Sequence, residues 1–93
     1  MAKDINGYEF GVCEFDIRGK IVDLEILENY EYAYERYLER LENTNPRYIR
    51  PDLWIVWIKD KEIVQLEQLS WNTKSKLINI DNYKSMKNIL KLL

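Results

Sequence analysis

Apolar and charged residues alternate along residues 8–27, the segment YEFGVCEFDIRGKIVDLEIL. A period of two predicts strands, and Gly19 with Lys20 at the centre predicts a hairpin turn in which the glycine supplies a positive φ. In this register six apolar residues lie on one side of the hairpin, in the pairs Ile17–Val22, Phe15–Leu24 and Cys13–Ile26.

At the beginning of this segment the apolar residues alternate in a different phase. Tyr8, Phe10 and Val12 are out of step with the apolar residues that follow. One extra residue in a strand produces such a change of phase, so we expect a β-bulge near Gly11 and Val12.

A period close to 3.6 replaces the alternation in ENYEYAYERYLERLEN, residues 28–43, and predicts an amphipathic helix with three arcs. The arc expected in the core consists of Leu27, Tyr30, Tyr34, Tyr37, Leu38 and Leu41, with Ala33 at its edge. The acidic arc consists of Glu28, Glu31, Glu35, Glu39 and Glu42. The third arc consists of Asn29, Tyr32, Arg36, Arg40 and Asn43.

The segment DLWIVWIKDKEIVQLEQLSW, residues 52–71, predicts a second hairpin with its turn centred on Asp60 and Lys61. The expected pairs are Ile58–Ile63, Trp57–Val64 and Ile55–Leu66. Residues 53–58 are apolar on both faces, which indicates a central strand covered on both sides. A fifth strand at 76–80 and a helix capped by Asp81 complete the chain, and the inward residues of that helix are Tyr83, Met86, Ile89, Leu90 and Leu93.

The order ββαβββα predicts a single small α+β domain over residues 1–93, with an antiparallel sheet of about five strands packed with two helices. The composition, 46% hydrophobic and 32% charged, is that of a globular protein. One cysteine and the absence of an apolar leader or spanning segment favour a cytoplasmic protein that does not enter the membrane.

Catalytic and cofactor signatures are missing from the sequence. It has no histidine, which removes the usual general base and the common zinc ligand sets, and its three glycines form no phosphate-binding loop. Cys13 alternates into an apolar strand face, so we expect a buried thiol. We therefore predict a protein that is not an enzyme and that binds no cofactor or metal; catalysis by carboxylates and tyrosines alone is the disfavoured alternative.

The charge distribution favours a protein partner. The net charge is -2, and residues 1–45 carry eleven acidic against five basic residues. Nucleic-acid binding requires a broad basic face, so it is disfavoured. The acidic arc is either a solvated surface or a docking surface for a basic patch on a partner. Tyr32 between Arg36 and Arg40 has the composition of a binding hot spot.

The polar face of the first hairpin adds four carboxylates to the candidate partner-binding residues. In the expected register Glu14 opposes Glu25 and Asp16 opposes Asp23, and opposed like charges destabilise a sheet. Three explanations are open: the register differs by a residue or lysines of neighbouring elements lie between the carboxylates, a basic partner binds there, or a divalent cation does.

An apolar sheet face is the last candidate surface, made of Trp54, Val56, Ile58 and Ile63. Two helices either cover both faces of the sheet or leave this one open as a homodimer interface. Two function classes follow. The first is a small acidic protein that occludes a protein partner, such as a phage-encoded inhibitor of a host enzyme or defence system, or a bacterial immunity protein. The alternative is an assembly subunit that forms a homo-oligomer through the exposed sheet face.

Overall fold

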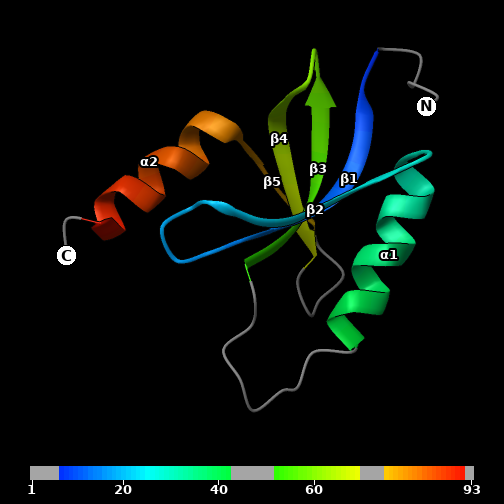
Figure 1. The fold of residues 1–93 in the computed structure, drawn as a ribbon, viewed down its shortest axis with the longest axis horizontal. Helices are drawn as coiled ribbons and strands as arrows, with labels where there is room; N and C mark the ends of the chain where they lie inside the picture. Colours follow the sequence, from blue (N-terminus) through cyan, green and yellow to red (C-terminus); the bar gives the residue numbers. More distant parts are fainter. Residues whose placement is uncertain (1–6, 43–51, 70–74, 92–93) are drawn as a thin grey trace.

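The computed structural model describes residues 7–42, 52–69 and 75–91, and it confirms the α+β fold (Figure 1). Five strands form one antiparallel sheet, and two helices pack on it in the order ββαβββα. The elements are β1 (Glu9–Phe15), β2 (Ile21–Leu27), α1 (Tyr30–Glu42), β3 (Asp52–Lys59), β4 (Glu62–Leu69), β5 (Ser75–Asn79) and α2 (Ile80–Lys91).

The strand order across the sheet is β2-β1-β3-β4-β5, so β3 is central as predicted. The two helices lie on opposite sides of the sheet (Figure 1). α1 contacts β1, β2 and β3, whereas α2 contacts β4 and β5. Each helix therefore covers a different half of the sheet on a different face.

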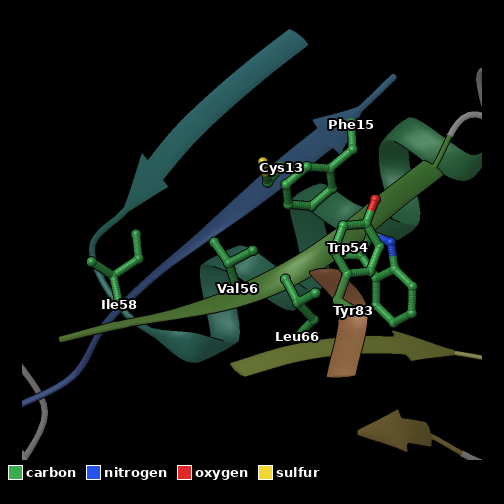
Figure 2. Close-up of a cluster of buried hydrophobic side chains, with 7 residues drawn as sticks. All are labelled: Cys13, Phe15, Trp54, Val56, Ile58, Leu66 and Tyr83. Carbon is green, nitrogen blue, oxygen red and sulfur yellow. The ribbon is translucent and has the colours of Figure 1, made fainter. Parts of the chain in front are cut away.

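Each face of the sheet has its own hydrophobic cluster. On the α1 side, Ala33 and Tyr37 pack with four sheet residues, namely Phe10, Val12, Leu53 and Ile55. On the α2 side, Tyr83 packs with Cys13, Phe15, Trp54, Val56, Ile58 and Leu66 (Figure 2). The interior strands β1 and β3 supply both clusters, which explains why they are apolar in both phases.

The predicted bulge near Gly11 is wrong. β1 pairs without interruption there, both with β2 and with β3. The two phases exist because Phe10 and Val12 face α1 while Cys13 faces the opposite cluster, so both sets of side chains are buried. The presence of glycine at position 11 has a separate cause. A Cβ atom there would lie 2.5 Å from the carbonyl oxygen of Glu25, so any larger residue would clash with β2.

The register of the first hairpin also differs from the prediction. Cys13 lies opposite Leu24 and Phe15 opposite Ile21, with an irregularity between Glu14 and Phe15. Asp16 closes the loop, because its Oδ1 accepts hydrogen bonds from the backbone N–H groups of Arg18 and Lys20. Ile17 consequently lies in the turn and is 80% exposed.

The second hairpin has the predicted turn and only part of the predicted register. Asp60 and Lys61 have φ values of 52° and 66°, which fit the two central positions of a type I′ turn. Ile58 pairs with Ile63 as expected. The register then shifts, so that the predicted pairs Trp57–Val64 and Ile55–Leu66 are replaced by Trp57–Gln65, Val56–Leu66 and Ile55–Glu67.

Asparagines begin both helices. The Oδ1 of Asn29 accepts a hydrogen bond from the N–H of Tyr32 at 2.9 Å, and the Oδ1 of Asn79 accepts one from the N–H of Asn82 at 2.8 Å. The cap of α2 is thus Asn79, and the predicted cap Asp81 lies inside the first turn. Of the predicted inward residues, Tyr83 is buried, Met86 is exposed, and the side chains of Ile89, Leu90 and Leu93 lie outside those described.

Candidate functional site

The carboxylates on the polar face of the β1–β2 hairpin are paired with arginines of α1. Arg40 contacts both Glu14 and Asp23 at 3.1 Å, and the Nε of Arg36 contacts Glu25 at 3.2 Å. These pairs form because α1 lies over β1 and β2, with its third arc directed at the hairpin. Arg36 and Arg40 are therefore half-buried sheet contacts, in contrast to the exposed hot spot predicted for them.

The opposed carboxylates are also fewer than expected. Glu14 lies opposite Asp23, Glu25 lies opposite Val12, and Asp16 belongs to the turn. Of the three explanations for the expected repulsion, a changed register describes the structure, and the side chains that offset the remaining repulsion are Arg36 and Arg40 of α1 in place of the expected lysines. The described residues contain no group of three or more side chains arranged to hold a metal ion.

The carboxylate of Asp16 stabilises the turn of the first hairpin. Hydrogen bonds from the backbone N–H groups of Lys20 and Arg18 hold the pKa of Asp16 below its ordinary value. This predicted partner-binding residue already has two backbone partners within its own loop.

The outer surface of α1 carries the acidic arc as predicted: Glu28, Glu31, Glu35, Glu39 and Glu42 are all exposed. The helix is rotated relative to the expected core arc, because Ala33 and Tyr37 face the sheet and are buried. Tyr34 and Leu38, expected in the core, are each 37% exposed. On a helical projection they lie along one side of the acidic arc, and the exposed Tyr32 lies along the other.

The arginines and the acidic arc are therefore separated by the fold. The Nη1 of Arg36 lies 3.4 Å from the Oε2 of Glu39. The Nε of Arg36 and both terminal nitrogens of Arg40 form ion pairs with carboxylates of the sheet. In the described part of the chain, Glu31 and Glu35 take part in no ion pair. We define the acidic surface as Glu28, Glu31, Glu35, Glu39 and Glu42 with Tyr32, Tyr34 and Leu38.

The predicted homodimer face is wrong for three of its four residues. Trp54 is 3% exposed, and Val56 and Ile58 are also buried, in the cluster that includes Tyr83 of α2 (Figure 2). Ile63 is half-buried against the same cluster. Trp54 and Val56 are covered by packing with Tyr83 of α2, so they are not available to a second chain.

The β1–β2 hairpin carries a group of exposed apolar residues instead. Five of them are 38–80% exposed, namely Ile17, Ile21, Val22, Leu24 and Ile26. Leu24 and Ile26 form one side of an open groove of about 910 Å³, and Ile80 and Tyr83 line its other side. Sequence reasoning placed the hairpin's apolar side in the core, and only the position of β2 at the sheet edge shows otherwise.

Two carboxylates, the half-buried Asp52 and the buried Glu67, hold elements together. Asp52 of β3 accepts hydrogen bonds from the indole Nε1 of Trp54 and from the hydroxyl of Tyr83, and it pairs with Lys87 at 2.7 Å. Glu67 of β4 accepts a hydrogen bond from the hydroxyl of Tyr30. Both contacts join a helix to the sheet, so their chemistry is that of structural anchors.

The thiol of Cys13 is buried in the cluster on the α2 side. Burial and, secondarily, the nearby Asp23 raise the pKa of Cys13 to about 12, so the thiol stays protonated at neutral pH. A protonated and buried thiol is a poor nucleophile, and this is consistent with the structural role predicted for Cys13.

Comparisons with known proteins identify no relative. No family model matches the chain, and neither the curated proteins nor the solved structures contain a match. Among the described residues, no helix is long and apolar enough to cross a membrane.

Proposed function

We propose that this protein is a non-enzymatic binding protein of the cytoplasm that occludes a basic patch on a protein partner, as phage-encoded inhibitors and bacterial immunity proteins do. The observation that carries this proposal is the separation of charge on α1. Its two arginines turn toward the sheet, and its glutamates remain exposed on the outer surface.

The acidic surface has the chemistry of a docking surface as well as its charge. Like-charged side chains four residues apart, such as Glu31 and Glu35, repel one another, and a basic partner would relieve that repulsion. Tyr32, Tyr34 and Leu38 add exposed apolar area on both sides of the acidic arc. Tyrosine is among the residue types that contribute most strongly to binding at protein interfaces.

The first test compares two variants with the same change in net charge. Glu35→Lys lies on the acidic surface, whereas Glu62→Lys lies at the start of β4. Both residues are exposed, so we expect both variants to fold like the parent. Proteins retained by the immobilised parent are identified at low and high salt. A purified candidate partner is then titrated against the parent, Glu35→Lys and Glu62→Lys.

A basic partner should bind the parent and Glu62→Lys alike. We expect Glu35→Lys to bind it about tenfold or more weakly, mainly through slower association, with the difference shrinking as salt rises. The affinity of Glu35→Gln for the partner should lie between those of the parent and Glu35→Lys. Equal binding of the partner by Glu35→Lys and Glu62→Lys would refute the acidic surface as the docking site.

The second candidate function is an assembly subunit that forms a homo-oligomer. The exposed apolar residues of β2 favour this candidate, since isolated exposed apolar residues are common but a run of them along one strand marks a contact surface. The surface concerned is the edge of the sheet, whereas the prediction placed it on the face of β3.

A further inference from the structure

β2 is the less protected edge of the sheet. Its sequence, IVDLEIL, contains no Lys, Arg or Pro, which are residues that commonly prevent an edge strand from pairing with another chain. The opposite edge strand, β5, has five residues, carries the exposed Lys76 and continues directly into α2. Among the described strands only β1 pairs with β2, which leaves backbone donors and acceptors along the other side of β2.

The side chains of β2 make this edge apolar on the groove side. Leu24 lies opposite Cys13 and Ile26 opposite Gly11, so both share the face of the cluster packed against α2. Leu24 is 38% and Ile26 is 39% exposed. An added strand would give each of them an apolar cross-strand neighbour.

The two ends of β2 carry opposite charges. Arg18 and Lys20 are exposed before its first residue, and Glu28 and Glu31 are exposed beyond its last. Seven residues of extended chain separate these groups by roughly 23 Å, at 3.3 Å per residue, so they do not meet within one chain. A strand that pairs with β2 in the antiparallel direction and carries the same charge pattern would bring each group to its opposite.

We propose that this strand is β2 of a second copy of the chain, paired antiparallel about a two-fold axis through the middle of the strand. The contact is isologous, and it joins two five-stranded sheets into one continuous sheet. Arg18 and Lys20 of each copy then lie beside Glu28 and Glu31 of the other. The proposal rests on the assembly function, and it shares only Glu28 and Glu31 with the acidic surface of the occluding function.

The carboxylates on the opposite face of β2 do not oppose this pairing strongly. Asp23 and Glu25 of the two copies would approach one another, but each already pairs with an arginine of α1 at 3.1 and 3.2 Å, respectively. The strands therefore bring together two partly neutralised rows of charge. The apolar row and the complementary ends supply the specificity.

Multi-angle light scattering of the full chain, from micromolar to millimolar concentration, measures the proposed dimer directly. We expect a mass of twice 11.3 kDa that falls toward 11.3 kDa on dilution. Leu24→Lys should remain at 11.3 kDa, and Leu77→Lys, the same kind of change on the exposed face of β5, should associate like the parent. Circular dichroism is the control that tests whether both variants retain the fold.

A charge exchange tests the register without adding a buried charge. Lys20→Glu should weaken association at least tenfold, and adding Glu28→Lys to the same chain should restore most of it, because residues 20 and 28 of the two copies lie opposite each other about an axis through Leu24. Glu35→Lys should leave the dimer unchanged, which keeps this test separate from that of the acidic surface. A parent that stays at 11.3 kDa throughout, as it would if β2 pairs only with a strand of a different protein, overturns the proposal. Equal association of Leu24→Lys and the parent overturns it as well.

Discussion

Tyr34 and Tyr37 show at the scale of single residues how the rotation of α1 sets stability. Tyr37 is 1% exposed and Tyr34 is 37% exposed, although both belong to the expected core arc. We expect Tyr37→Ala to lower the free energy of unfolding by roughly 3–5 kcal/mol, because it leaves a cavity. Tyr34→Ala should cost less than about 1 kcal/mol. Urea unfolding of both variants tests this, and equal losses would show that the helix is not rotated as described.

Tyr83 predicts a dependence of stability on alkaline pH. Burial and, secondly, the hydrogen bond donated to Asp52 raise the pKa of Tyr83 above its ordinary value of about 10. The folded protein holds this proton more tightly than the unfolded chain does. The stability that Tyr83 contributes is therefore complete below about pH 10 and is lost as the pH rises above that value.

The variant Tyr83→Phe isolates this contribution. At neutral pH it should lower the free energy of unfolding by about 1–2 kcal/mol, since Trp54 and Lys87 still bind Asp52. Above about pH 10 the variant should lose less stability than the parent, because it has no hydroxyl to ionise. Urea unfolding at neutral and alkaline pH measures both effects. Parallel loss in parent and variant would contradict the assignment, and Tyr30, whose pKa is also raised, would then be the next residue to test.

At the scale of elements, Arg40 fixes α1 on the β1–β2 hairpin by separating Glu14 from Asp23. We expect Arg40→Ala to cost about 1–2 kcal/mol, and less at high salt, because the two carboxylates are then opposed without a cation between them. Replacing Glu14 by Gln in the Arg40→Ala background should recover part of the loss. The same Glu14→Gln change should be destabilising in the parent.

A double-mutant cycle of chemical unfolding, run at low and high salt, measures this coupling. Arg36→Ala provides the comparison, since Arg36 and Glu25 are more exposed and their ion pair should contribute less. If Glu14→Gln costs the same with and without Arg40, the arginine does not act by separating the carboxylates, and its contribution is packing alone.

At the scale of the whole molecule, the diagonal arrangement of the two helices creates both proposed surfaces. α1 covers the β2 half of the sheet on one face, and it presents its acidic arc outward. α2 covers the β5 half on the other face (Figure 1). The apolar side of β2 is therefore left beside an open groove. The two surfaces share Glu28 and Glu31, but Glu35 belongs only to the acidic surface and Leu24 only to the edge strand, which is why Glu35→Lys and Leu24→Lys should change different properties.

The order of the elements and the turn at Asp60 and Lys61 could be predicted from the sequence, because period and turn chemistry are local properties. The acidic arc of α1 was predictable for the same reason, since residues of one sign recur along one line of the helix. A helical projection gives the order of the arcs around the axis. It does not give the direction in which the helix rests on the sheet.

The tertiary structure decided which arc faces inward, and with it the burial of Tyr37 and the pairing of Arg36 and Arg40 with the hairpin. It also decided the register of the first hairpin, because the carboxylate of Asp16 closes a longer loop than Gly19 and Lys20 alone predict. The burial of Trp54 and the exposure of Leu24 depend on where α2 lies and on which strand forms the edge. These are contacts between residues far apart in the chain, and no local period encodes them.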